Sequence, residues 1–255
     1  MSAAWWRRLG AFVSPPPLAA EPWRIALQGC PLAQGLDHAR QNELRRLVGV
    51  FLARKRFHPL GGVDLSDADC ALIAMQACLP VLRQGPRNLR GWRDILVYPG
   101  EFRVKRSHHD DRSGVVTESD DVLIGEAWER GPLVLSLADV QLDLAHPWDG
   151  YNVVVHEIAH KLDMLDGPPD GVPVLPANIP RRQWIVAFQR AFDLLSNDVA
   201  RGRDTLIDPY AAESPDEFFA VVSELHWSQP SVLRRADAAV AGLLEAYYGP
   251  PPAPV

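Results

Sequence analysis

The stretch Val153–Met164 reads VVVHEIAHKLDM and places a glutamate directly after the first of two histidines. On a helix, about 100° separates successive residues, so His156 and His160 project from one face a turn apart and can bind one ion. Asn152 and Asp163 fall on the same face. The opposite face is apolar and carries Val155, Ile158 and Leu162, with Val154 and Leu165 at its margin. The pattern predicts a helix whose apolar back packs in the core and whose narrow polar face is rich in metal ligands.

The residue types on this polar face suit metal-assisted hydrolysis. Two neutral imidazoles bind a borderline ion such as zinc, and a third protein ligand would leave one coordination position for water. Glu157 lies roughly 100° around the helix from His156, where it can take a proton from that water. Zinc lowers the pKa of a bound water from about 15.7 to ~7, so a carboxylate can complete the deprotonation at neutral pH. Asp163, one turn beyond His160, can accept the outer N–H of a ligand imidazole.

Length, charge and cysteine content restrict the class of protein. A chain of 255 residues is long enough for a large domain with its own core. Its net charge of −6 argues against a nucleic-acid binder, because no basic surplus exists to neutralise phosphates. Cys30, Cys70 and Cys78 form no Cys-x-x-Cys pair, which indicates small buried hydrophobes in a reducing compartment. No run approaches the ~20 apolar residues of a membrane span, so we expect a cytoplasmic protein without one.

Turn signals and periodicity divide the chain into segments. We expect an N-terminal segment with a stiff, non-helical proline-rich linker over residues 1–22, one domain over residues 23–248, and a disordered proline-rich tail over residues 249–255. Strand patterns occur at residues 94–104, 121–126 and 133–137, and helical patterns at residues 37–57, 66–82, 149–166, 177–197, 218–227 and 232–248. This order predicts a mainly helical α+β domain with a small mixed or antiparallel sheet beside the motif helix.

Two further stretches contain residue types that can bind a ligand. His108, His109, Asp110 and Asp111 are metal-ligand types, but contiguous ligands rarely converge and the turn-rich sequence favours a solvated loop. The strand expected at residues 133–137 directly precedes the motif helix. Its edge can pair with an extended peptide, although packing alone explains the strand equally well.

A third metal ligand is needed, and the segment after residue 210 offers three carboxylates. These are Glu213, Glu217 and Glu224, of which the last two are seven residues apart and so share nearly one helix face. Ser214, Pro215 and Glu217 also fit a capping box with proline at the first helical position. Spacing alone does not decide whether Glu217 caps its own helix or binds a metal.

Taken together, these stretches resemble the Mlc titration factor A family of zinc peptidases, which is related to the lethal-factor type of gluzincin. The resemblance rests on HEIAHKLD at residues 156–163 and YAAESPDEFFAVVSE at residues 210–224. Residues 51–60, FLARKRFHPL, and residues 78–82, CLPVL, are also similar. So are ILVYP at residues 95–99 and GPLVL at residues 131–135. The resemblance therefore covers roughly residues 20–248 and implies a zincin-like domain.

The resemblance also assigns roles to individual residues. It implies that His156, His160 and Glu217 bind one Zn²⁺ and that Glu157 activates water. It further implies that Tyr210 donates a hydrogen bond to the oxyanion. Asp163 and Glu224 would support the ligands. Family members resemble aminopeptidases, so we expect action on short peptides, with Glu213 or Glu224 as alternatives for holding the substrate's α-ammonium.

Two other interpretations are open. The family is named for capturing a glucose-responsive repressor, so the chain can be a binding protein that sequesters such a transcriptional repressor. A structural zinc site is the second alternative, and it requires a fourth protein ligand, for which Asp163 or Glu224 would serve. An intact Glu157 favours catalysis, because a metal that only stabilises the fold needs no general base.

Overall fold

Short apolar runs form a sheet of three parallel strands in this computed structural model, which describes residues 15–100 and 131–254. The strands are β1 (Arg56–Pro59), β2 (Asp94–Tyr98) and β3 (Leu133–Ser136), in that order across the sheet. Phe57 lies opposite Ile95, which lies opposite Leu133. Alternate residues of β2 are buried, so one face of the sheet packs against the helices.

The mainly helical α+β class is confirmed, but the described strands are parallel rather than mixed or antiparallel. The physical reason lies in the connection between β1 and β2, which contains the helix α4 (Asp67–Cys78). A helical crossover of this kind brings the chain back in the same direction. The helical pattern at residues 37–57 overlaps the first residues of β1, so the sequence does not predict this strand. The expected strand at residues 121–126, the expected strand residues 101–104 and the loop at residues 107–114 lie outside the described residues.

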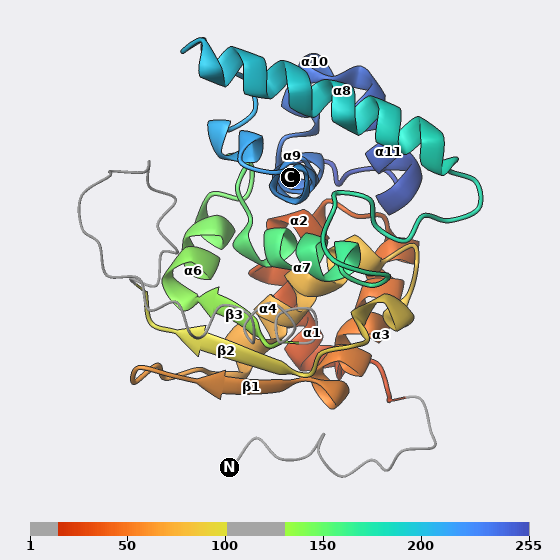
Figure 1. The fold of residues 1–255 in the computed structure, drawn as a ribbon. Helices are drawn as coiled ribbons and strands as arrows, with labels where there is room; N and C mark the ends of the chain where they lie inside the picture. Colours follow the sequence, from red (N-terminus) through yellow and green to blue (C-terminus); the bar gives the residue numbers. More distant parts are fainter. Residues whose placement is uncertain (1–14, 101–130, 255) are drawn as a thin grey trace.

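Helices cover the buried face of the sheet in successive layers (Figure 1). Before the sheet's second strand lie α1 (Ala20–Gln28), α2 (Pro31–Gln34), α3 (His38–Arg54), α4 and the short 3₁₀ turns η2 (Leu79–Val81) and η3 (Pro86–Leu89). After β3 come α6 (Leu137–Ala145), α7 (Val153–Asp163), α8 (Arg181–Ala200), η4 (Pro209–Ala212), α9 (Pro215–Ser228), α10 (Pro230–Ala236) and α11 (Ala238–Tyr248). In Figure 1, α7 lies between the sheet and α9, and α8 lies beyond α9.

Several helices begin directly after a residue whose side chain caps the first turn. Asp37 accepts a hydrogen bond from the Arg40 backbone at the start of α3, and Ser66 forms a capping box with Asp69 at the start of α4. The helix expected over residues 232–248 is instead two helices, because Asp237 ends α10 and caps α11. The prediction that residues up to Pro22 cannot be helical was wrong for α1, since a proline in the first turn removes no intrahelical hydrogen bond.

The apolar back of the motif helix lies in the core, as its sequence predicts. Val155, Ile158 and Leu162 are fully buried on α7, which packs against α9, α4 and β3. The three cysteines are unpaired, and none is exposed. At the C-terminal end the Ala253 N–H donates to the Gly35 carbonyl, so this part of the expected tail contacts the turn before α3. None of the helices built from the described residues is both long and apolar enough to span a membrane.

Candidate metal centre

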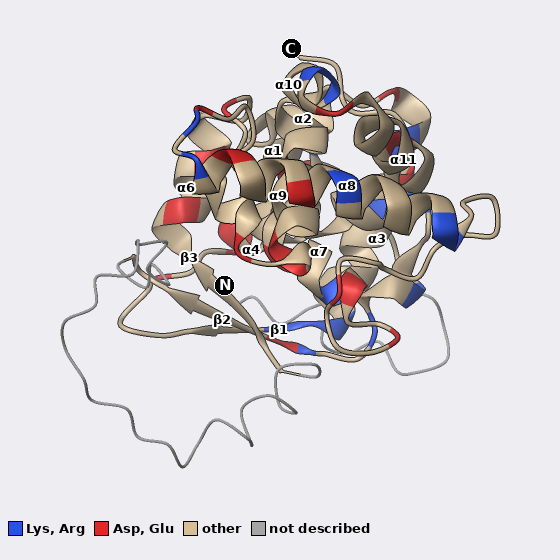
Figure 2. Cartoon of the chain, turned by 45° about the horizontal axis from the view of Figure 1, so that its top comes forward, with Lys and Arg blue, Asp and Glu red and all other residues tan. Residues whose placement is uncertain are grey.

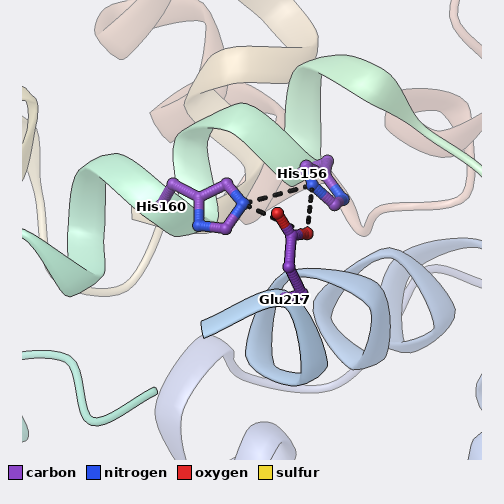
Figure 3. Close-up of side chains that lie close together, drawn as sticks. All are labelled: His156, His160 and Glu217. Atoms are coloured by element: carbon purple, nitrogen blue, oxygen red, sulfur yellow. Dashed lines mark hydrogen bonds and ion pairs between the residues drawn. The ribbon is translucent and has the colours of Figure 1, made fainter. Parts of the chain in front are cut away.

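The candidate centre lies where α7 and α9 face each other. Both helices begin with an oxygen cap: Asn152 Oδ1 accepts from the Val155 N–H, and Ser214 Oγ accepts from the Glu217 N–H. His156 and His160 point from α7 toward α9, and Glu217 points from the first turn of α9 toward the two imidazoles (Figure 3). Glu217 therefore takes part in the cap through its backbone N–H, while its carboxylate belongs to the centre.

The three side chains present one ligand atom each within a small volume. Glu217 Oε2 lies 3.1 Å from His156 Nε2 and 3.5 Å from His160 Nε2, and the two Nε2 atoms are 3.2 Å apart. Four ligands at the usual zinc–nitrogen and zinc–oxygen distances would be about 3.3 Å apart in a tetrahedron. Glu217 Oε2 is buried, and its nearest polar neighbours within the described residues are these two imidazole nitrogens. These positions fit three ligands of one ion.

Electrostatics at the centre also suit a cation. Burial opposes protonation of His156, but its bonds to Glu217 and Glu224 outweigh burial and raise the pKa of the imidazole to about 10. Burial likewise opposes ionisation of Glu217, yet His156 and His160 hold the pKa of its carboxyl well below its usual range. A cation between these groups would replace the proton that His156 otherwise holds.

Glu224 supports His156 from the side opposite the centre. Its carboxylate is buried, and Oε1 lies 2.7 Å from His156 Nδ1. Oε2 accepts the Asn152 backbone N–H at 2.5 Å, at the start of α7. Bonding at Nδ1 directs Nε2 of the imidazole toward the centre. Glu224 thus lies where the sequence places a supporting carboxylate, and it joins α9 to the start of the motif helix.

Asp163 has a different partner from the one expected. Its Oδ2 accepts the Gly171 N–H at 2.8 Å, so it anchors the segment that follows α7. The carboxylate beside the outer nitrogen of His160 is Asp216, with Oδ2 at 3.8 Å from Nδ1. Burial raises the pKa of Asp163 to about 6. Among the described residues, neither Asp163 nor Glu224 belongs to the group that brings ligand atoms together.

Glu157 and Tyr210 belong to two different elements, α7 and η4. Glu157 is half-buried on α7, next to His156, and its charge favours the protonated form of that imidazole. Tyr210 is half-buried on η4, and its ring centroid is 6.3 Å from that of His156. The structure therefore brings the Tyr210 ring near the candidate ligands, although about 50 residues separate them along the chain.

Asp208, Tyr151 and Asp216 also contact the elements of the centre, and no motif in the sequence singles them out for that role. Asp208 Oδ1 accepts the Tyr210 N–H at 2.8 Å, and Oδ2 accepts the Tyr151 hydroxyl at 2.8 Å. This bridge links η4 to the residue before the α7 cap. The Asp-Pro pair at residues 208–209 is a recognisable turn signal for Asp208. No local signal marks Tyr151, whose partner is 57 residues away.

Comparison with known proteins gives the family. A family model described as glucose-regulated metallo-peptidase M90 matches residues 3–249. The chain belongs to this metallopeptidase family. Mlc titration factor A from Cronobacter sakazakii is 36% identical over 218 residues, covering 84% of this chain and 80% of the relative. The proteins of that name from Escherichia coli and Klebsiella pneumoniae are 36% identical over 216 and 221 residues, with the same coverage. The resemblance stated from the motifs is confirmed.

In this M90 chain, Gly171 sets the distance between the end of α7 and the start of α9. Its φ is +78°, and a Cβ there would lie 2.6 Å from the Pro215 carbonyl oxygen. We expect Gly171→Ala to lower the free energy of unfolding by about 1–3 kcal/mol more than Gly202→Ala. Gly202 also has a positive φ of +62°, but its Cβ would meet no atom within 4 Å.

Urea unfolding of both variants checks this prediction, and zinc affinity gives a second readout. Displacing Pro215 moves the first turn of α9, which carries Glu217. We therefore expect only Gly171→Ala to weaken binding of a metal ion such as zinc at the candidate centre. Equal losses of stability in the two variants would show that the cost is backbone strain alone.

Proposed function

We propose that this chain is a zinc-dependent peptidase of the gluzincin type that acts as an aminopeptidase on short peptides. The observation that carries the proposal is the convergence of His156 Nε2, His160 Nε2 and Glu217 Oε2 within 3.1–3.5 Å of one another. Membership of a metallopeptidase family supports it. Zinc would be held by these three residues and, when bound, would polarise the substrate carbonyl and lower the pKa of water.

The remaining roles follow from the residues around the centre. Glu157 takes the proton of the attacking water and passes it to the leaving amine. Tyr210 donates a hydrogen bond to the oxyanion that forms on the substrate. Glu224 holds the imidazole of His156 in the tautomer that leaves Nε2 free of hydrogen. Because Glu224 is already buried against His156, the exposed Glu213 is the better of the two carboxylates proposed for the substrate's α-ammonium.

A peptide would lie along β3 in this proposal. β3 is at one end of the sheet among the described strands and packs against α7. An extended chain can add to the edge of such a strand through backbone hydrogen bonds. Regulation of a transcriptional repressor is a second role, supported by the name Mlc titration factor A that the relatives carry.

The test compares leucine anilide with N-acetyl-leucine anilide. Purified protein is stripped with a chelator and then reloaded with one equivalent of zinc. We expect hydrolysis to disappear on stripping, return with zinc and be confined to the substrate with a free α-amine. Equal cleavage of both substrates would reject aminopeptidase action, and activity unaffected by stripping would reject the metal mechanism.

A further inference from the structure

A pocket with basic residues lies at the end of the sheet where β1 begins, and none of the candidate metal ligands lines it. The pocket has a volume of about 320 Å³ and is bounded by the end of α3 and by residues 86–92. Four of its lining residues are basic, the exposed Arg54, Arg87 and Arg90 and the buried Lys55. No carboxylate lines it among the described residues. Figure 2 shows Lys and Arg segments near β1 with acidic segments beside them, and the whole chain has a net charge of −6.

Lys55 holds the wall of this pocket in place. Its Nζ donates to the Leu89 carbonyl at 2.7 Å and to the Trp92 carbonyl at 2.8 Å, and it lies 3.0 Å from the centroid of a Trp92 ring. Burial lowers the pKa of this amine to about 7, and a neutral amine still has two N–H groups for the two carbonyls. The segment that carries Arg87 and Arg90 is thus fixed against α3 by an internal side chain. A site formed before ligand binding needs little ordering when the ligand arrives.

The arginines of the pocket are available to a ligand. Arg54, Arg87 and Arg90 are exposed and form no ion pair with any residue in the described ranges. Six other arginines of the described residues pair with carboxylates, while Arg201 and Arg235, like the pocket arginines, form no ion pair there; the paired ones are Arg24, Arg46, Arg181, Arg190, Arg203 and Arg234. A planar guanidinium presents two parallel N–H groups, a geometry that suits carboxylate and phosphate oxygens.

From this arrangement we infer that the pocket binds a small organic anion, with its phosphate or carboxylate group on Arg87 and Arg90. The apolar body of the ligand would contact Leu89 and Trp92, which line the same pocket. The volume of about 320 Å³ is near the lower end for small-molecule sites, which favours a small ligand. A long polyanion is a poor fit, because the acidic charge of the remaining chain would repel it.

The experiment is isothermal titration calorimetry on the full, zinc-loaded chain at constant ionic strength. The probes are phenyl phosphate, benzoate and the neutral phenol, which share one ring and differ in charge. We expect one or both anions to bind with a Kd below about 1 mM and phenol not to bind. A preference for phenyl phosphate identifies a phosphate ligand, a preference for benzoate identifies a carboxylate, and equal binding shows recognition of charge alone.

Paired variants locate the binding. Arg87→Gln/Arg90→Gln should weaken anion binding at least about tenfold, because two charge-assisted contacts are lost. Arg201→Gln/Arg235→Gln removes the same charge from exposed positions outside the pocket and should bind as the wild type does. Equal urea midpoints for the two double variants verify that both are folded. Binding that survives Arg87→Gln/Arg90→Gln, as binding at the metal centre would, overturns the inference, as does binding of phenol equal to that of the anions.

Discussion

Replacing Glu157 with glutamine is expected to leave the zinc content at about one per chain and to lower kcat for leucine anilide by about 10²–10⁴-fold. Glutamine has nearly the shape of glutamate but cannot accept the proton of the attacking water. The candidate ligands His156, His160 and Glu217 are unchanged, so the ion should remain bound. KM should change little, because the substitution removes a group that acts in the transition state.

Zinc analysis and steady-state kinetics check this expectation, with Glu21→Gln as the control. Glu21 is an exposed glutamate that pairs with Arg24 on α1, far from the candidate centre in sequence. If wild type and Glu157→Gln both bind zinc and neither cleaves, binding of a regulator becomes the leading function. If neither retains zinc, the metal centre itself is rejected.

Part of the candidate centre can be predicted from the sequence because two of its residues lie on one helix. The spacing of His156 and His160 depends only on helical periodicity, and α7 has the apolar back that this periodicity requires. Glu217 was one of three candidate carboxylates from the residues alone, and family resemblance was needed to choose it. The structure places its carboxylate beside both imidazoles, while its backbone N–H serves the cap of α9.

Other features depend on contacts between distant residues. β1 is a four-residue strand at the end of a helical pattern, and its pairing with β2 crosses an intervening helix. Asp163 follows His160 by three residues in the sequence, so its spacing suggested it as the partner of an imidazole. Asp216 is distant in the sequence but lies beside His160 in the structure. The segment after α7 turns back so that Gly171 takes the Asp163 carboxylate, and α9 brings Asp216 beside His160. Sequence periodicity contains no information on such turns.

Glu224 provides the second large expected effect, because its carboxylate accepts from two donors. One is the Asn152 backbone N–H, and the other is Nδ1 of His156 when Nε2 faces an ion. Glutamine has one acceptor oxygen, so its amide would face one of these donors. We therefore expect Glu224→Gln to weaken zinc binding about 10–100-fold, almost as much as Glu224→Ala. Glu43→Gln is the control, since Glu43 pairs with Arg46 away from the centre.

The dependence of this deficit on pH separates a role at the imidazole from a general loss of stability. Glu224 is one of the groups that raise the pKa of His156 to about 10, so protons compete with zinc in the wild type throughout the neutral range. Without this carboxylate the imidazole loses its proton at a lower pH. As the pH is raised, the zinc affinity of the variant therefore reaches its maximum at a lower pH than that of the wild type. Competition with a chromophoric chelator should therefore show a larger deficit at about pH 8.5 than at about pH 6.5. A deficit independent of pH would mean that Glu224 acts only by holding the start of α7 through the Asn152 N–H.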